Sequence, residues 1–423
     1  MKKYGLAPLL LATKIKSRQD QRVRVAEASQ LVSSETYANL HKFSLSLTKL
    51  RACNCHPHLN IVLPELSAQS FFAGIRTAID FGIGLAARLG VKPRIVVLRD
   101  SPIGPQRRQL LGMLVGEYGE SLSGIDIVHP RILSESGVSP GDFWLATHWT
   151  TAHPLDVACR VGEIDRSRVA YLVQDYEAGF NAWSTDYALA RSSLYAGFTM
   201  VVNSRPLYDY ILKMDEISIN PSLVFAPRLD VNRLERAVSV RSKGNTQSGP
   251  LVMFYGRPSK PRNLFSIGCA SLMAANKILL AQGVAANFVS AGESHQSVRA
   301  LNFELESRGK LSWDSYFALL AQTDVVLSLQ HSPHPSHPPL DAVCSGAWAV
   351  TNEMDGTRAG LHPRLLTSLA DPDALASSVV DAVLCAMSSP AVEYDAGFLD
   401  VLGRPFDSVL DDFAGHFDAS AGA

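Results

Sequence analysis

Two successive series of short apolar runs constrain the fold of this chain more than any other feature of its sequence. The first series lies at 60–64, 94–98, 124–128, 143–147, 168–173 and 198–202. The second lies at 251–255, 286–290, 325–329 and 347–351, with helices expected around 264–282, 314–322, 339–345 and 372–388. Strands that alternate with helices are typical of a parallel sheet with helices on both faces. The sequence therefore predicts an α/β protein with two such units.

The polar segment 239–249, rich in Gly and Ser, separates the two series and is predicted to be a linker. A hinge around 236–249 would let one unit move against the other. The first unit is assigned to 57–238 and the second to 249–392. Residues 1–56 mix polar helix formers with weak apolar spacing and are predicted to form a helical extension.

The overall composition excludes several classes of function. With 47% hydrophobic and 19% charged residues, the chain can bury substantial cores and lacks a disordered signature. Its formal net charge of −1 supplies no global field for a polyanion, so no nucleic-acid partner is expected. No run of about 18 uninterrupted apolar residues occurs, which argues against a membrane-spanning helix.

The N-terminal region and the cysteines favour a cytoplasmic protein. The apolar run that begins at Gly5 is short and soon meets Lys14, so it is a poor export signal. The six cysteines lack the density or spacing of a disulfide scaffold, which fits a reducing cytoplasm. The basic stretch Lys14–Arg24 favours a solvated helix over a lipid-binding surface. Any membrane contact is expected to be peripheral, at the inner face of the plasma membrane.

Loops that follow strands are the places to look for chemistry, because ligands collect at the carboxyl ends of parallel strands. The first such loop contains Gly256, which permits a sharp turn, and the cations Arg257, Lys260 and Arg262 ahead of a predicted helix. The guanidinium group of arginine presents several N–H donors in a fork, which matches the oxygens of a diphosphate. The spacing of these residues alone does not distinguish a diphosphate site from a solvated basic loop.

A second loop, 331–337, follows the run at 325–329 and contains His331, His334 and His337. The intervening prolines hold it extended and no ligating Cys or carboxylate supports it, so a metal site is disfavoured. A loop that closes over a ligand with exposed backbone N–H groups fits better. Asp341, which follows, is either a helix-start residue or an acceptor of hydrogen bonds from sugar hydroxyls.

In the first unit, Asp175 and Glu177 follow a strand and stand among Tyr176, Phe180 and Trp183. In a carbohydrate subsite, planar rings typically stack on the faces of the sugar, and carboxylates accept hydrogen bonds from its hydroxyls. The alternative is that the three rings are core residues and the two acids are exposed.

Three further patterns carry less weight. His148 follows the run at 143–147 and is a candidate acceptor contact, although a histidine beside a tryptophan is as often structural. The pattern Gly82–Ala87 matches a dinucleotide fingerprint but lies inside a predicted helix, where the fingerprint does not operate. The cluster at 53–58, with two cysteines and two histidines, is too crowded for a metal tetrad.

The segments 256–263 and 338–346 resemble those of retaining GT-B glycosyltransferases, a group that includes sucrose synthases and many polysaccharide-building enzymes. Within that group, the chain is most similar to rhamnosyltransferases of bacterial surface rhamnans, through 173–177, 203–205, 254–264 and 332–340. The resemblance implies two Rossmann-like domains that face a cleft, and a C-terminal helix within 393–423 that crosses back to the first domain.

The resemblance also implies roles for individual residues. The diphosphate of the donor is expected to bind Gly256, Arg257 and Arg262, the last standing where the family has a lysine. Asp341 takes the place of the commoner glutamate that binds the ribose. Pro333 stands where the family has a second glutamate, so the loop 332–337 is expected to contact the transferred sugar. The donor-binding set is thus Gly256, Arg257, Arg262, Ser336, His337, Leu340 and Asp341.

On the acceptor side, Gly74 is the rough counterpart of the family's glycine loop, and Gln174 and Asp175 stand in its histidine region. The expected acceptor contacts are Gly74, His148, Asp175, Tyr176 and Glu177. Arg257 and Arg262 would stabilise the leaving group while Asp175 or Glu177 orients the acceptor hydroxyl. These four are the predicted catalytic residues.

The activity that the resemblance implies is transfer of a sugar, with L-rhamnose from dTDP-rhamnose as the best match, to a hydroxyl of a growing bacterial surface polysaccharide. The reaction would retain the anomeric configuration and need no metal cofactor. The expected partners are a nucleotide-sugar donor, a glycan or lipid-linked glycan acceptor, and a second copy of the chain or other glycan-assembly proteins. A catalytically silent GT-B-like binding subunit and a UDP-sugar epimerase of related fold remain as alternatives.

Overall fold

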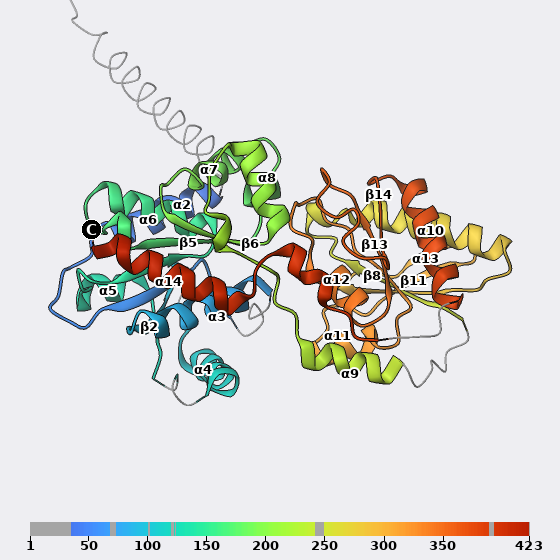
Figure 1. Cartoon of the computed structure of the whole chain (residues 1–423), viewed down its shortest axis with the longest axis horizontal. Helices are drawn as coiled ribbons and strands as arrows, with labels where there is room; N and C mark the ends of the chain where they lie inside the picture. Colours follow the sequence, from blue (N-terminus) through green and yellow to red (C-terminus); the bar gives the residue numbers. More distant parts are fainter. Residues whose placement is uncertain are drawn as a thin grey trace, which may run out of the picture.

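The computed structural model describes residues 35–67, 73–99, 102–119, 122, 124–241, 249–388 and 393–422. These residues form two α/β units, each built on its own sheet (Figure 1). The prediction of two Rossmann-like units is confirmed. The basic stretch Lys14–Arg24 lies outside the described residues.

The first unit contains a seven-stranded parallel sheet in the order β3-β2-β1-β4-β5-β6-β7. Its strands are β1 (His58–Leu63), β2 (Lys92–Val97), β3 (Asp126–Val128), β4 (Phe143–Ala146), β5 (Val169–Val173), β6 (Thr199–Asn203) and β7 (Val224–Phe225). The strand order reverses between β1 and β4, and ligands collect at such a switch point.

Both faces of this sheet are buried. On β5, Val169, Tyr171 and Val173 join one core cluster while Ala170 and Leu172 join the other, because successive side chains in a strand point to opposite faces. One face is covered by α2 (Glu35–Leu47), α5 (Pro130–Ser136), α6 (Trp149–Arg160), α7 (Thr185–Ser193) and α8 (Arg205–Asp215). The other is covered by α3 (Ala73–Arg88), α4 (Gly104–Tyr118) and α14 (Phe406–Gly422).

Two helices from the ends of the chain complete the first unit. Helix α2 buries Leu40, Phe43 and Leu47 along one face, a spacing of three and four residues that suits a helix. The C-terminal helix α14 lies across the same unit (Figure 1), where Leu410 and Phe413 are almost completely buried. The core of the first unit therefore needs the last segment of the chain.

The second unit contains a seven-stranded sheet in the order β10-β11-β9-β8-β12-β13-β14, parallel except for the antiparallel pair β10 and β11. Its strands are β8 (Leu251–Gly256), β9 (Asn287–Gly292), β10 (Val298–Ala300), β11 (Phe303–Ser307), β12 (Val325–Leu327), β13 (Trp348–Asn352) and β14 (Leu365–Ser368). Helices α10 (Phe265–Ala281) and α13 (Pro372–Ser388) cover one face, and α9 (Val231–Arg241), α11 (Trp313–Leu320) and α12 (His337–Cys344) the other.

The structure differs from the expected connection between the units. Helix α9 extends into the predicted linker and packs on the second unit, since Leu234 is buried in its core and Arg241 donates hydrogen bonds to the carbonyl oxygens of Leu320 and Thr323. The residues 231–238, assigned to the first unit, therefore belong with the second. The chain crosses between the units within 226–230, ahead of the expected hinge, and 242–248 lie outside the described residues.

The sequence pattern did not predict four of the strands, β7, β10, β11 and β14. β7 has only two residues, β10 has an arginine at its centre, β11 alternates buried and exposed side chains, and β14 ends in two polar residues. They lie at or next to the edges of their sheets, where one face or side of a strand is not covered.

The segment Pro261–Ala281 is long and apolar enough to cross a membrane, as many core helices of soluble proteins also are. It was not expected from the sequence, because charged and polar residues interrupt the run. Within the described residues no other helix meets this test. In this fold its helix α10 packs against α13 and contributes Leu272 and Leu279 to the core of the second unit.

Candidate functional site

Two loops at the carboxyl edge of the second sheet carry the predicted donor residues. One follows β8 and the other follows β12, and these neighbouring strands flank the point where the strand order reverses. Gly256 ends β8 in a crowded place, because a Cβ there would lie 2.6 Å from Ser290 Oγ and 3.0 Å from the ring of Phe265. Any larger residue would displace the start of the basic loop from the sheet.

Arg262 is the predicted donor residue that meets the first unit. Its guanidinium lies 3.8 Å from the ring centroid of Phe180, which belongs to the first unit. Burial lowers its pKa, and the charges of Asp175 and Glu177 act in the opposite direction. Its Nε is buried and has no hydrogen-bond partner among the described residues. The arginine thus has donor capacity left for a ligand.

Tyr255 lies close enough to Arg257, Arg262 and Asp341 for the charges of all three to affect its pKa. Burial raises the pKa of its hydroxyl; the charge of Asp341 adds to this rise, and the charges of Arg257 and Arg262 oppose it. The backbone of the same loop is held by a hydrogen bond from the Lys260 amide to the carbonyl of Arg257. Arg257 and Arg262 follow β8, and Asp341 lies in the helix that follows β12, so the three residues belong to the same edge of the second sheet.

Asp341 is the fifth residue of α12 and is 6% exposed. The hydroxyl of Tyr316 donates to its carboxylate at 3.1 Å. Burial raises the pKa of Asp341 to about 7, partly offset by this hydrogen bond. A buried acid with one protein donor retains acceptor sites for the hydroxyls of a ligand.

The first turn of α12 places backbone donors beside this acid. Pro338 and Pro339 have no amide hydrogen and the Ser336 amide donates to His334, so His337 carries the N–H group of that turn that can bind a ligand. The Leu340 side chain is completely buried in the core, which corrects its expected role as a donor contact. Ser336, before the helix, has φ of 70°, a left-handed conformation that costs a non-glycine residue energy.

The loop after β12 is held by Arg358, a residue that the sequence analysis missed. Its side chain is 1% exposed, and its guanidinium donates to the carbonyl oxygens of Asn352 at 2.5 Å, Gln330 at 2.9 Å, Ser332 at 2.5 Å and His334 at 3.2 Å. These contacts fix the loop in the conformation that meets the first unit. No local motif marks such a residue, because its partners are backbone atoms of a distant segment.

Replacing Arg358 by methionine is expected to lower the free energy of unfolding by about 3 kcal/mol or more, because buried carbonyl oxygens would lose their donors. Chemical denaturation measures this loss. Arg299→Met is the matched control, since Arg299 is an exposed arginine on β10, and should change stability by less than about 0.5 kcal/mol. Equal stability of Arg358→Met and the parent protein would contradict the assigned role.

Asp175 joins the two units directly. Its carboxylate accepts hydrogen bonds from the Ser332 hydroxyl and, at 3.4 Å, from the Gln330 side chain, both on the loop after β12. Burial raises its pKa, and Arg262 and Ser332 act against this rise. Asp175 therefore lies where both units and the donor arginine meet.

Glu177 lies in a buried polar pocket of the first unit, behind Asp175. It accepts hydrogen bonds from the Trp149 amide at 2.6 Å and the Tyr171 hydroxyl at 3.2 Å, and its other oxygen lies 3.5 Å from His148 Nε2. Burial raises the pKa of Glu177 to about 8, and the nearby charge of Asp175 adds to this rise. Burial also lowers the pKa of His148 to about 4, so neutral forms dominate at neutral pH.

Glu177 should make the free energy of unfolding fall as the pH rises from about 4.5 to about 8. The folded protein holds this proton at a pKa of about 8, whereas the unfolded chain releases it near 4.5, so raising the pH favours unfolding until the folded pKa is passed. Glu177→Gln should flatten this part of the pH profile in denaturation experiments. Glu135→Gln, at an exposed site, should leave it unchanged; the same slope in both variants would contradict the prediction.

The remaining acceptor-side predictions have mixed outcomes. Gly74 lies in the first turn of α3, and its carbonyl accepts a hydrogen bond from Gln174 at 3.0 Å, so it adjoins the end of β5. His148 caps α6 through the Thr150 amide while facing Glu177, so it serves structure and site together. Tyr176 is 6% exposed and packs on Tyr210 in the core, which corrects its expected place among the acceptor contacts.

The discounted patterns have structural roles. Gly82 lies in α3, where a Cβ would come within 2.4 Å of Ile61 on β1, so it permits close packing of helix on sheet. The three histidines after β12 form no metal site, and no group of potential ligands among the described residues could hold an ion. Instead, His334 accepts a hydrogen bond from the Ser336 amide and shapes the loop.

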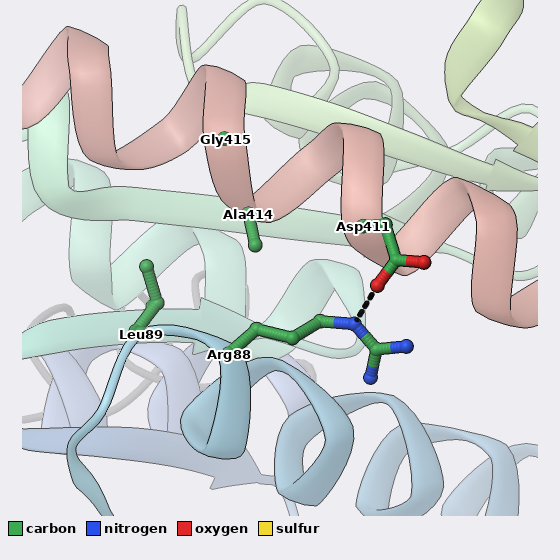
Figure 2. A pocket seen from close by; sticks show the side chains of 5 residues that line it. All are labelled: Arg88, Leu89, Asp411, Ala414 and Gly415. Atoms are coloured by element: carbon green, nitrogen blue, oxygen red, sulfur yellow. Dashed lines mark hydrogen bonds and ion pairs between the residues drawn. The ribbon is translucent and has the colours of Figure 1, made fainter.

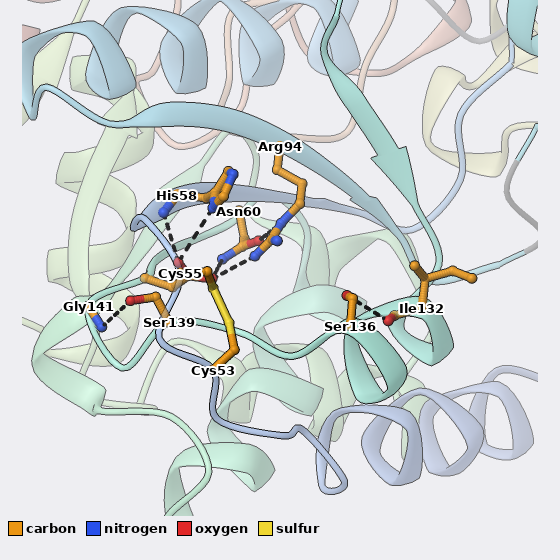
Figure 3. The surroundings of a disulfide bond; sticks show 10 residues. Cys53, Cys55, His58, Asn60, Arg94, Ile132, Ser136, Ser139 and Gly141 are labelled. Carbon is orange, nitrogen blue, oxygen red and sulfur yellow. Dashed lines mark hydrogen bonds and ion pairs between the residues drawn. A yellow bond between two sulfur atoms is a disulfide. The ribbon is translucent and has the colours of Figure 1, made fainter.

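A disulfide joins Cys53 and Cys55 (Figure 3), a pairing that the spacing of the cysteines did not predict. It lies beside a buried polar network in which Arg94 donates to Asp142 at 2.6 Å and to Asn60 at 2.7 Å. The cysteines and histidines of the segment 53–58 therefore belong to the connection between α2 and β1.

A pocket on the far side of the first unit is separate from this site. Arg88, Leu89, Asp411, Ala414 and Gly415 line it, between the end of α3 and α14 (Figure 2). The ion pair of Arg88 with Asp411, at 2.6 Å, lies at this pocket and fastens α14 to the first unit.

Arg262 of one Rossmann-like unit thus lies beside Phe180 and near the charges of Asp175 and Glu177 of the other, where the two units meet. Sucrose-phosphate synthase from Thermosynechococcus elongatus has the same fold, with a TM-score of 0.52, 12% identity, and coverage of 86% of this chain and 94% of that chain. The N-terminal domain of trehalose-6-phosphate phosphatase from Candida albicans also has it, with a TM-score of 0.52, 10% identity, and coverage of 86% and 97%. These likenesses show the fold alone.

Sequence comparison gives the family. The family model described as "WsaF, N-terminal domain" matches residues 58–203, and that described as "WsaF, C-terminal domain" matches 250–380. The chain belongs to the WsaF family of GT-B glycosyltransferases. The O-antigen biosynthesis protein RfbC of Myxococcus xanthus is 28% identical over 296 residues, which cover 68% of this chain and 21% of that protein. The matched region thus spans about a fifth of the length of that relative.

Proposed function

We propose that this protein transfers L-rhamnose from dTDP-rhamnose to a hydroxyl of a bacterial surface glycan, with retention of configuration. The observation that carries the proposal is the position of Arg262, which packs on Phe180 opposite Asp175. The family and the similarity to an O-antigen biosynthesis protein support a surface polysaccharide as the product. The rhamnosyltransferase activity of WsaF itself supports the sugar.

The reaction forms a bond between the acceptor oxygen and the anomeric carbon while the bond from that carbon to the diphosphate breaks. The electron pair of the broken bond leaves with the diphosphate, whose charge Arg257 and Arg262 stabilise. The acceptor hydroxyl attacks from the face that the diphosphate leaves, and its proton passes to a leaving phosphate oxygen. Asp175 orients that hydroxyl, so neither an enzymic nucleophile nor a metal ion is part of the scheme.

Asp341 is the proposed contact for the sugar of the nucleoside. A deoxyribose 3′-hydroxyl can donate to its carboxylate beside the Tyr316 hydroxyl, which already donates at 3.1 Å. The backbone donors at the start of α12 complement the diphosphate. We further propose that the reaction takes place in the cytoplasm, at the inner face of the plasma membrane.

The direct test is incubation of the full chain with dTDP-rhamnose, UDP-glucose or GDP-mannose, each with and without a rhamnan oligosaccharide. Mass spectrometry detects the product, and NMR reports the configuration of the new linkage. A product one rhamnose longer, formed with retention from dTDP-rhamnose, supports the proposal. Donor binding without transfer or hydrolysis favours a silent subunit, and conversion of the donor sugar without an acceptor favours an epimerase.

A further inference from the structure

The aromatic ring of Trp183 is the most exposed large apolar side chain among the described residues, with 92% of its surface accessible. It lies between the 3-10 turn Glu177–Phe180 and α7, on the loop that also carries the acids of the proposed site. Trp144 and Trp149, in contrast, are buried in the core. Single exposed apolar side chains are common on protein surfaces, so the position of this ring on the loop decides whether it can bind a ligand.

The ring of Trp183 has an aromatic neighbour. Trp183 stacks on Tyr187 with ring centroids 5.5 Å apart and planes inclined by 6°. Tyr187 lies in the first turn of α7, where its amide donates to the capping hydroxyl of Ser184 at 3.3 Å. Burial, Asp215 and a hydrogen bond with Tyr187 together raise the pKa of Tyr176, which ties the lower ring to the core. The stacked pair, Trp183 on Tyr187, leaves the outer face of Trp183 free.

The stacked pair adjoins the proposed transfer site. Phe180, whose ring lies beneath the guanidinium of Arg262, precedes Trp183 by three residues. A fully extended chain advances at most about 3.6 Å per residue, so the two Cα atoms are within about 11 Å of each other. The Trp183 backbone therefore lies close to the residue that meets Arg262, at a separation that a short oligosaccharide can span.

The chemistry around the ring distinguishes between classes of ligand. Asn181, Ser184 and Asp186, all polar, surround Trp183 in the sequence, and no contiguous apolar surface extends from it along this loop. A protein or lipid surface would need an apolar patch of several hundred Å². A single aromatic face with polar neighbours suits a pyranose, whose C–H groups stack on the ring while its hydroxyls bond at the rim.

We propose that the outer face of Trp183 is an acceptor subsite that stacks a pyranose ring of the growing glycan, one or two sugars away from the hydroxyl that is glycosylated. This proposal rests on the proposed function, since it assigns the acceptor of that reaction. It implies that the protein prefers an oligosaccharide acceptor to a single sugar.

The test compares Trp183→Ala and Trp183→Phe with Leu301→Ala, a matched control in which an exposed apolar side chain is removed from the edge of the second sheet. Calorimetry measures binding of a rhamnose trisaccharide, a mannose trisaccharide and methyl α-L-rhamnoside to the full chain. Hydrolysis of dTDP-rhamnose without acceptor measures donor chemistry separately.

Trp183→Ala should weaken binding of at least one trisaccharide about tenfold, while methyl rhamnoside binding and donor hydrolysis stay unchanged. Trp183→Phe, which keeps a ring, should lose about threefold or less, and Leu301→Ala should bind as the parent protein does. Equal trisaccharide binding by Trp183→Ala and the parent protein, or no binding by the parent protein, would overturn the subsite. Trisaccharide binding without any donor turnover would instead overturn the proposed reaction.

Discussion

Replacing Arg262 by alanine is expected to lower the turnover number by about 10²–10³-fold, because a preorganised donor to the developing diphosphate charge is lost. Its guanidinium lies 3.8 Å from the Phe180 ring centroid and near the charge of Asp175, so the folded protein already holds it where the two units meet. Arg257→Ala should have an effect of the same order. The double variant should lose less than the product of the two effects, since the residues act as a unit.

Lysine at position 262 should restore part of the lost turnover, because it keeps the charge but not the fork of donors. Lys260→Ala is the matched control, since Lys260 is an exposed cation on the same loop. Steady-state kinetics with dTDP-rhamnose gives the turnover numbers of these variants and of the parent protein. Near-normal turnover in Arg262→Ala would reject its assignment to the donor diphosphate.

Replacing Asp175 by asparagine is expected to lower the turnover number by about 10²-fold or more, while donor affinity changes little. The carboxylate lies where the two units meet, and the Tyr176 amide, Ser332 and Gln330 donate to it in the absence of substrate. An acceptor hydroxyl would replace one of these donors. Asparagine keeps the shape of the side chain but has only one oxygen to accept hydrogen bonds.

A second variant separates this catalytic role from a purely structural one. Ser332→Ala leaves the carboxylate in place and removes the hydroxyl that ties it to the second unit. If Asp175 orients the acceptor, Ser332→Ala should retain most of the turnover of the parent protein. Equal losses in Asp175→Asn and Ser332→Ala, measured under saturating donor, would show that Asp175 acts by holding the units together.

The parts of the site that could be predicted from sequence are those carried by loops next to strong strands. Arg257 and Arg262 follow β8, and Asp175 and Glu177 follow β5, both continuous apolar runs. Position at the carboxyl end of a parallel strand is a local signal, so these residues could be singled out before the fold was known.

The parts that could not be predicted depend on contacts between distant segments. Arg358 acts through backbone carbonyl oxygens of the loop after β12, and Tyr316 reaches Asp341 from another helix. Three aromatic residues of one loop looked alike in sequence, yet Tyr176 is 6% exposed and Trp183 is 92% exposed. Helix α9 likewise packs on the second unit through its buried Leu234, although the polar segment 239–249 predicts a linker later in the chain.

If the second unit binds the nucleotide of a dTDP-linked sugar, a thermal-shift panel of dTDP, UDP, GDP, ADP and NADH will show which nucleotide stabilises the protein. A ligand that binds only the folded protein stabilises it by about 2.7 kcal/mol when present at about 100 times its Kd. We expect dTDP to raise the Tm of the parent protein and to lose this effect in Arg257→Ala. No rise in Tm with any nucleoside diphosphate would contradict the account.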